Sequence, residues 1–270
     1  MIIGNKNFNE NKTHIMGILN VTPDSFSDGG SYNNIEAALK HVKEMTEDGA
    51  EIIDVGGEST RPGYTQITDE EEISRVVPII RAIKENFDVP ISIDTYKSKV
   101  ARAALSAGAD MLNDIWGLKY DKDMADTAAK FNVPVCLMHN RDNTDYSDFL
   151  NDVTQDLAES ISIAEQAGIK REKIILDPGV GFAKSLEQNL IITKNMELLK
   201  NLGCPVLLGT SRKSMIGLTL DLPKNERVEG TVATSVIACM KGAMFVRVHD
   251  VKENYRAVKM TQAIWDSDRY

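Results

Sequence analysis

The chain has 270 residues, of which 42% are hydrophobic and 26% are charged, and its formal net charge at pH 7 is −9. It contains no basic block, no apolar run near the ~18 residues of a membrane span and no secretory segment, so we expect no nucleic-acid partner, no membrane insertion and no export. The three cysteines show neither a disulfide framework nor a metal-binding spacing, which favours a cytoplasmic protein.

Residues 1–12 are mostly polar and are expected to form a short lead-in to the first strand. Beyond them, apolar runs typical of buried strands alternate with segments whose apolar residues have helical spacing. The predicted strands are residues 14–20, 51–55, 90–94, 111–114, 134–139, 173–177, 205–210 and 243–249. The predicted helices are residues 34–48, 69–86, 96–107, 121–130, 151–167, 186–201, 228–241 and 250–265.

The predicted strands are nearly continuous in apolar residues, as expected when both faces of a parallel sheet are buried. Strict alternation of strands and helices indicates an α/β fold, and a count of eight favours a closed barrel over an open sheet. No linker or low-complexity segment divides the chain. We therefore predict a single (β/α)8 TIM barrel domain over residues 1–270, a size common for this fold.

The stretch Ser211–Ser214 follows the seventh predicted strand, and Met215–Leu218 after it can begin a helix. Two hydroxyls and two cations, from Arg212 and Lys213, are thus placed where a helix N-terminus favours an anion. Taken alone, the stretch is typical of a capped surface turn. The interpretation as an anion site is favoured because most other predicted strands also end in polar clusters.

In a TIM barrel the active site lies at the carboxyl ends of the strands. In this chain those ends supply Asn20, Thr60, Arg61, Asp94, Asn113, His139, Asp177, Lys213, Arg247 and His249. Any one of them fits a capping or turn residue, since the rim of a barrel is polar in any case. Together they predict one polar site at the mouth of the barrel.

One group at these ends suits an anion. Arg247 and His249 are two residues apart on a strand and therefore point to the same side. With Arg61 they suit phosphate, because the guanidinium fork matches phosphate oxygens. Asn20 offers a neutral oxygen ligand for Mg²⁺, which would share its shell with phosphates and water. The alternative for His249 is a helix N-cap or a packed imidazole.

A second group, Asp94, Asn113 and Asp177, suits a heterocycle that carries N–H and NH₂ donors. Such a pocket rejects analogues that lack the donors, because its own buried polar atoms would then be unpaired. The alternative is a pair of carboxylates for general acid and base catalysis.

Over nearly its whole length the chain resembles the dihydropteroate synthase family. The matching segments are Ile18–Gly30, Glu58–Gly63, Ser92–Thr95, Asn113–Ile115, Asp177–Phe182, Gly209–Ser214 and Arg247–Val251. After the fifth predicted strand, Met138–Arg141 departs from the Met-Gln pattern common in other members, which affects the details of one loop.

The resemblance implies a TIM barrel and a reaction of folate biosynthesis. In it the amine of p-aminobenzoate displaces diphosphate from 6-hydroxymethyl-7,8-dihydropterin diphosphate and gives 7,8-dihydropteroate. The resemblance also implies a homodimer, small-molecule substrates, Mg²⁺ as the cofactor, and loops 21–30 and 58–65 that close over the site.

Residue by residue, the resemblance implies three groups of contacts. The pterin-binding residues would be Asp94, Asn113, Asp177 and Lys213, and the diphosphate-binding residues Thr60, Arg61, Arg247 and His249, with Mg²⁺ on Asn20. Those around p-aminobenzoate would be Phe26, Pro62, Phe182 and Ser214, with its carboxylate at the helix N-terminus after Lys213. The implied catalytic residues are Lys213, Arg247, Asp94 and Asp177.

Two other functions share parts of this pattern. A corrinoid-dependent methyltetrahydrofolate methyltransferase has the pterin pocket but needs no diphosphate end, and Thr60-Arg61 and Arg247-Val248-His249 favour the synthase. A non-catalytic pterin-binding paralogue should have lost Lys213, Arg247 or the loop with Phe26, and this chain retains them.

Overall fold

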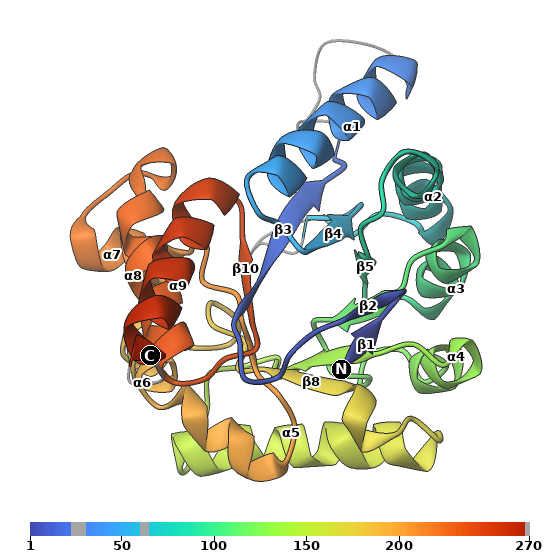
Figure 1. Cartoon of the computed structure of the whole chain (residues 1–270). Helices are drawn as coiled ribbons and strands as arrows, with labels where there is room; N and C mark the ends of the chain where they lie inside the picture. The colour runs from blue at the N-terminus through green and yellow to red at the C-terminus, as the bar shows by residue number, and fades with distance from the viewer. Residues whose placement is uncertain (23–30, 60–64, 268–270) are drawn as a thin grey trace.

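Parallel strands form a closed ring in this computed structural model, which describes residues 1–22, 31–59 and 65–267 (Figure 1). The ring contains β3 (His14–Asn20), β4 (Ile52–Gly56), β5 (Ile91–Asp94), β6 (Met111–Asp114), β7 (Val135–Met138), β8 (Ile174–Asp177), β9 (Leu207–Leu208) and β10 (Phe245–Val248). β10 pairs with both β9 and β3, and a parallel bridge from Leu176 to Val206 joins β8 to the segment that enters β9. The predicted (β/α)8 barrel is confirmed.

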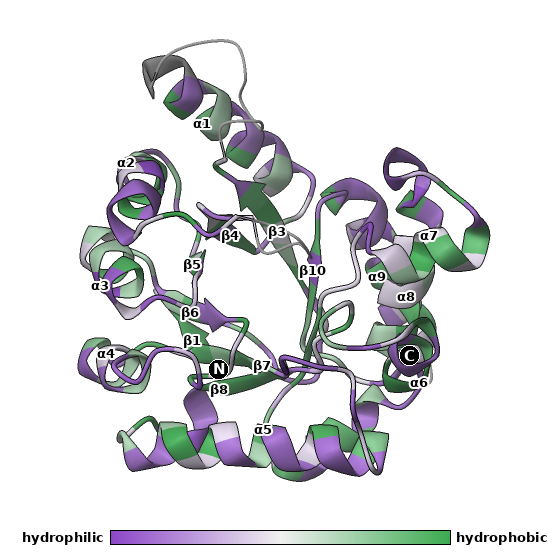
Figure 2. Cartoon of the chain, turned by 180° about the vertical axis from the view of Figure 1, so that it is seen from behind, coloured by the Kyte–Doolittle hydropathy of each residue, from purple (hydrophilic) through white to green (hydrophobic). Residues whose placement is uncertain are grey.

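Helices surround the ring, with their polar faces outward and the apolar strands inside (Figure 2). They are α1 (Ser31–Glu47), α2 (Asp69–Asn86), α3 (Ser98–Ala107), α4 (Met124–Phe131), α5 (Phe149–Gln166), α6 (Leu186–Lys194), α7 (Ser214–Leu220), α8 (Val228–Met240) and α9 (Val251–Trp265). Short 3₁₀ helices occupy Arg171–Lys173, Met196–Leu202 and Lys224–Glu226. Among the described helices, none is long and apolar enough to cross a membrane.

One predicted helix is interrupted. The helix predicted at 186–201 is divided, because Asn195 leaves the helical conformation and its side chain donates to the carbonyl of Ile191 at 2.8 Å. Asn side chains compete with the backbone in this way and so interrupt helices. The helix expected to begin at Met215–Leu218 is present as α7, which lies between β9 and α8 and ends where Asp221 adopts a left-handed conformation at φ +55°.

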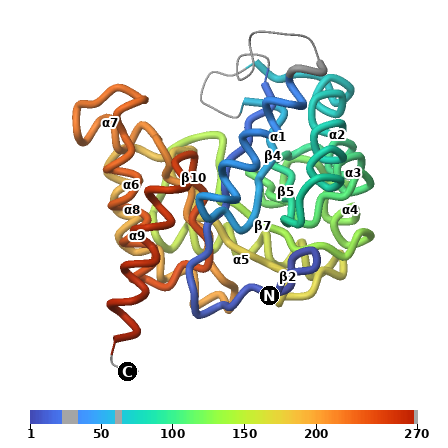
Figure 3. The backbone as a smooth tube through the Cα atoms, turned by 45° about the horizontal axis from the view of Figure 1, so that its top comes forward, coloured from blue at the N-terminus to red at the C-terminus, as the bar shows by residue number. Residues whose placement is uncertain are grey.

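The N-terminal lead-in is structured. Its β1 (Ile2–Ile3) and β2 (Lys6–Asn7) form an antiparallel hairpin at the lower end of the barrel in Figure 3, while α7 lies toward the upper end. Ile3 and Phe8 are buried against an apolar layer made of Met16, Ile52, Met111, Cys136, Ile175, Leu207, Met244 and Phe245. The hairpin therefore closes the amino-terminal end of the barrel.

The strands place the site by simple alternation. On β4, Ile53 and Val55 point outward into the core beneath the helices, whereas Ile52 belongs to the apolar layer inside the barrel. Side chains two residues apart share a face, about 6.6 Å apart along the strand. The next inward position on β4 is therefore Asp54, and the same rule on β10 leads from Phe245 to Arg247. A polar layer thus lies directly above an apolar floor.

Candidate active site

A cavity of about 560 Å³ opens at the carboxyl ends of the strands. Within the described part of the chain, every residue assigned above to a binding role lines it: Asn20, Asp94, Asn113, Asp177, Phe182, Lys213, Ser214, Arg247 and His249. Four others, Phe26, Thr60, Arg61 and Pro62, lie outside the described residues. The strand-end residue His139 is buried but is not among the residues that line the cavity.

Arg247 is held between two carboxylates at the centre of the polar layer. Its Nε donates to Asp54 Oδ2 at 2.5 Å and its Nη2 to Asp94 Oδ2 at 2.6 Å. Although burial opposes its charge, the two carboxylates raise the pKa of Arg247. The group expected to bind the anion is therefore in direct contact with the group expected to bind the heterocycle.

Asp54 is a site residue that the sequence analysis missed. It is fully buried, and its Oδ2 also accepts from Asn113 Nδ2 at 3.2 Å. The sequence analysis looked for polar residues at the ends of strands. It missed Asp54 because this residue lies inside an apolar run, two residues before the end of β4. The available signal was a single charged residue in a buried strand, at a position with the same inward direction as Ile52.

Acceptors in the polar layer remain open to a ligand. Asp54 Oδ1 and Asp94 Oδ1 are buried without a hydrogen-bond partner among the described residues. Burial raises the pKa of Asp94 to about 7, with the charge of Arg247 acting against it, and burial also raises the pKa of Asp177. Buried polar atoms in native proteins are nearly always paired, so these oxygens fit a ligand that brings N–H donors.

Lys213 enters the cavity from the loop before α7. Its Nζ donates to the carbonyl of Val180 at 2.5 Å and lies 4.7 Å from the centre of the Phe182 ring, a cation–π contact. Burial lowers its pKa to about 8, while the charge of Asp177 opposes the change. Gly181 allows this approach, because a Cβ there would lie 3.1 Å from Lys213 Cδ.

His249 presents a neutral imidazole to the cavity. Ser211 Oγ accepts a hydrogen bond from the backbone N–H of His249 at 3.0 Å. The hydroxyl hydrogen of Ser211 can then be donated to His249 Nδ1, which lies 2.9 Å away. Burial and the charge of Arg247 lower the pKa of His249 to about 3. Nε2 then carries the hydrogen, which makes His249 an uncharged donor.

The basic side chains at the rim of the barrel differ in their contacts. Arg212 turns to Asp250, to which its Nε donates at 2.9 Å, although it lies beside Lys213 in the sequence. Lys224 and Arg227 line the cavity from the segment between α7 and α8 and were not predicted. No motif or periodicity marks these two residues, so only the folded path of the chain reveals them.

The residues present fit Mg²⁺ only as a partner of a bound substrate. Among the described residues, no group of three or more His, Cys, Asp or Glu side chains is placed to hold a metal. Asn20 lines the same cavity as Arg247 and His249. Mg²⁺ is commonly held by one or two protein ligands together with substrate phosphates and water, and a single amide oxygen suits that arrangement.

Relatives of known name match the whole of this architecture. A family model described as pterin binding enzyme matches residues 16–249. A dihydropteroate synthase of Clostridium beijerinckii is 66% identical over 266 residues, covering 98% of this chain and 99% of the relative. That of Bacillus subtilis is 55% identical over 253 residues, covering 94% of this chain and 89% of the relative.

Solved structures agree. The dihydropteroate synthase of Clostridium difficile, crystallised in the presence of pteroic acid, has a TM-score of 0.93 and 51% identity and covers 96% of this chain and 99% of its own. The Xanthomonas albilineans enzyme with 4-aminobenzoic acid has a TM-score of 0.90 and 43% identity, with coverages of 95% and 94%. These matches favour the synthase over the methyltransferase and the non-catalytic paralogue. The chain therefore belongs to the family of pterin-binding enzymes and, within it, to the dihydropteroate synthases.

Proposed function

We propose that the cavity joins p-aminobenzoate to 6-hydroxymethyl-7,8-dihydropterin diphosphate, with release of diphosphate, through the residue roles that follow. The observation that supports this most strongly is the position of Arg247, which contacts the buried carboxylates Asp54 and Asp94 in the same cavity as the neutral donor His249. One cation thus lies where the two halves of the first substrate would meet.

The pterin ring would bind over the polar layer. Its N–H and NH₂ groups would donate to Asp94 Oδ1 and to Asp177, and Asn113 would complete the set. Gly209 lines the same cavity, and its Cα faces Asp177 and Arg247, so the ring would lie against bare backbone there. Asp94 Oδ1, which has no hydrogen-bond partner among the described residues, would then be paired, which selects pterins over rings without donors.

The diphosphate would lie at the rim, against Arg247 and the Nε2–H of His249. Thr60 and Arg61 would join from the loop after β4, and Asn20 would supply the protein ligand of Mg²⁺. When bound there, Mg²⁺ would neutralise charge on the departing diphosphate. Fixed donors aimed at charge that develops in the transition state are usually the largest contribution to catalysis.

p-Aminobenzoate would bind on the Lys213 side. Phe182 and Ser214 line this part of the cavity, Phe26 and Pro62 would complete it, and α7 begins at Ser214. The N-terminus of α7 has no side-chain cap, which leaves its backbone N–H groups for the carboxylate of the substrate. The amine would then face the carbon that bears the diphosphate.

In the reaction the C–O bond to diphosphate breaks, its electron pair leaves with the oxygen, and the amine nitrogen forms the new C–N bond before it loses a proton. Asp94 and Asp177 would favour the positive charge that spreads over the dihydropterin as diphosphate departs. An aryl amine is unprotonated at pH 7, so no strong base is needed. Alignment of the two reactants supplies much of the remaining acceleration.

A second copy of the chain would cover the outer face of α7 and α8. Large apolar side chains are exposed there, with Leu218 67% exposed and Met240 49% exposed, beside Leu220 and Ile237. Apolar clusters of this kind commonly mark interfaces between proteins. The homodimer and a cytoplasmic location, which suits the three free cysteines, are parts of this proposal.

The defining experiment mixes the purified protein with pterin diphosphate, p-aminobenzoate and Mg²⁺, and follows both products. We expect equal amounts of 7,8-dihydropteroate and diphosphate. We also expect EDTA to suppress turnover and added Mg²⁺ to restore it. A preparation that is folded but makes no dihydropteroate at saturating substrates would show that the proposed function is wrong.

Arg247→Ala should weaken binding of the pterin diphosphate by roughly 30-fold. This factor corresponds to about 2 kcal/mol, which is typical for a hydrogen bond to a charged group. The diphosphate-free pterin should lose much less, because its contacts lie on the carboxylates. Calorimetric titration of both ligands measures the difference, with Arg247→Lys to separate the charge from the guanidinium fork. Equal losses for the two ligands would contradict the diphosphate role.

Lys213→Ala should lower turnover by roughly 100-fold, as removal of one electrostatic donor from an active site does. Because the pKa of Lys213 is lowered to about 8, its ammonium is charged below that pH and is lost as the pH rises through it. The kcat/KM for the pterin diphosphate should therefore fall above about pH 8 in the wild type, since kcat/KM reports the free enzyme, and residual Lys213→Ala activity should lack this fall. Lys170→Ala, at a side chain that is 70% exposed, is the matched control.

Leu218→Lys should convert the dimer to a monomer, because it places a charge in the proposed apolar interface. Light scattering after size-exclusion chromatography measures the mass of each variant. The same substitution at an exposed apolar residue of another helix, Met260→Lys on α9, should leave the dimer intact. A wild-type protein that is monomeric at tens of micromolar would contradict the proposal.

A further inference from the structure

The loop between β8 and α6, residues 178–185, carries groups that Lys213 contacts. The carbonyl of Val180 accepts from Lys213, and the ring of Phe182 lies beside its ammonium. The loop has an unusual backbone, with φ at +68° for Gly179 and +46° for Ala183. A left-handed residue other than glycine persists only where the surrounding structure holds it.

Lys184 makes several of the contacts that keep this loop in place. Its ammonium lies 3.0 Å from the carbonyl of Gly179, 3.0 Å from the carbonyl of Phe182 and 2.8 Å from Nδ1 of His139. A lysine ammonium has three donors, and here each has one acceptor. Two of these bonds bind the loop to itself, and the third attaches it to the end of β7.

His139 is prepared to receive the third bond. It is buried, and its Nε2 lies 2.9 Å from Asp156 Oδ2 on α5. Burial and the charge of Lys184 lower the pKa of His139 to about 3, so the ring is neutral. Its one N–H then points to the carboxylate, which leaves the Nδ1 lone pair for Lys184.

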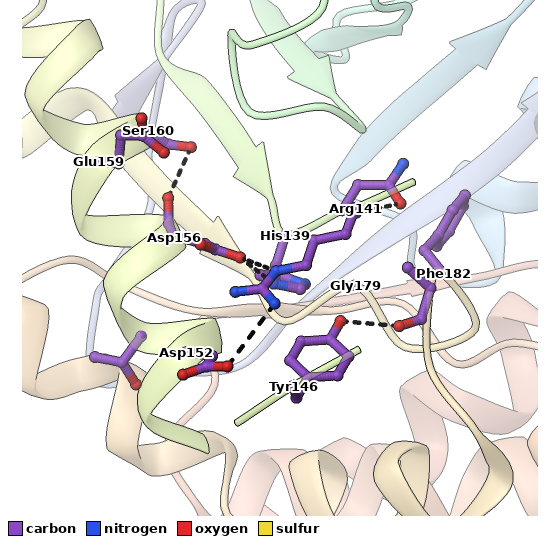
Figure 4. Close-up of polar contacts among 12 residues, drawn as sticks. His139, Arg141, Tyr146, Asp152, Asp156, Glu159, Ser160, Gly179 and Phe182 are labelled. Carbon is purple, nitrogen blue, oxygen red and sulfur yellow. Dashed lines mark hydrogen bonds and ion pairs between the residues drawn. The ribbon is translucent and has the colours of Figure 1, made fainter. Parts of the chain in front are cut away.

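Arg141 fixes the far end of this chain of contacts. Its Nε donates to the same oxygen of Asp156 at 2.6 Å, and Figure 4 shows Arg141 and His139 meeting at that carboxylate. Arg141 also lies 4.5 Å from the ring centre of Tyr146, whose hydroxyl donates to the carbonyl of Ala183 at 2.8 Å. Both routes from Arg141 thus end on the β8–α6 loop.

We propose that Lys184, oriented by His139, is the positioning residue of the p-aminobenzoate half of the active site. It holds the carbonyls of Gly179 and Phe182 and thereby sets the Phe182 ring and the Val180 carbonyl against Lys213. Neither Lys184 nor His139 lines the cavity, so they act through the loop and not on the substrates. This inference rests on the proposed function, because that function places p-aminobenzoate beside Phe182.

The structure separates this role from general stabilisation of the barrel. On the pterin side of the cavity, the backbones of Asp94, Asn113 and Asp177 are fixed in β5, β6 and β8. Asp177 is also joined to the loop, because the N–H of Gly179 donates to its Oδ1 at 2.7 Å. Loss of the Lys184 contacts should therefore lower kcat and raise the KM for p-aminobenzoate more than the KM for the pterin diphosphate, because two of the pterin-binding side chains, Asp94 and Asn113, come from strands outside the loop.

The test compares variants that remove the contacts with one that conserves them. Lys184→Met keeps the length of the side chain without its donors, and His139→Leu removes both contacts of the ring. His139→Gln retains an N–H for Asp156 and an oxygen for Lys184, so it should rescue the effect of the leucine variant. Lys194→Met, at an exposed lysine of α6, is the control.

We expect Lys184→Met and His139→Leu to raise the KM for p-aminobenzoate about tenfold, within the range that misplaced active-site groups produce. The KM for the pterin diphosphate should rise by a clearly smaller factor, and His139→Gln should stay near the wild type. Equal increases in both KM values, no increase in either, or a glutamine variant as impaired as the leucine variant would overturn the proposal.

Hydrogen exchange provides a measurement that needs no substrate. Amides of residues 179–185 should exchange faster in Lys184→Met than in the wild type, while the strands around Asp94 and Asn113 stay protected. A protein without synthase activity would refute the proposed function alone, whereas unchanged exchange in this loop would refute the role of Lys184. Arg141→Gln, at the partly exposed end of the network, provides a milder variant if His139→Leu does not fold, and it should raise the same KM two- to threefold.

Discussion

The ion pairs of the largely buried Arg247 with two carboxylates are the interaction on which the rest of the site depends. Its partners Asp54 and Asp94 are 193 and 153 residues away in the sequence, so only the closed barrel brings the three together. A buried charge is very costly unless it is paired, and removing one partner of a buried pair typically costs about 3–5 kcal/mol. The barrel must therefore close in one register, with β10 beside β3, for these charges to meet.

The apolar floor beneath the ion pairs explains their strength. Phe245 lies two residues before Arg247, and Ile52 lies two residues before Asp54, so each charged side chain is one pleat above a member of the floor. The hairpin closes that floor with Ile3 from the other side and keeps water from it. Attraction between charges is stronger where water is excluded, so the hairpin acts on the electrostatics of a site it does not touch.

Much of this arrangement was predictable because it follows from periodicity. Apolar runs gave the strands, and the rule of polar strand ends found Asp94, Asp177 and Arg247, which the fold brings into one cavity. The same rule selected His139, which turns behind the cavity to Asp156. It missed Asp54 because a strand-end rule does not examine strand interiors.

Two features could not be predicted, because their sequences have only a weak local pattern and their positions are set by tertiary contacts. The hairpin at residues 1–12 buries only a few apolar side chains among polar ones, so its composition resembles a linker. The segment with Lys224 and Arg227 reaches the cavity only because α7 ends at a left-handed Asp221 and the chain turns back. Neither feature has a periodic signal that a sequence window could detect.

The ion pairs of Arg247 also bear on the affinity of the proposed site for diphosphate. The guanidinium of Arg247 has two carboxylate partners within the protein, so a diphosphate at the proposed site would compete with Asp54 and Asp94 for its charge. In the proposed reaction this competition lowers the affinity for free diphosphate, because the protein regains its own ion pairs on release. The bound pterin shifts the balance the other way, since its donors pair the carboxylate of Asp94. Arg247 would then hold diphosphate most strongly while the pterin is in place, and catalysis requires such preferential stabilisation of the reacting state.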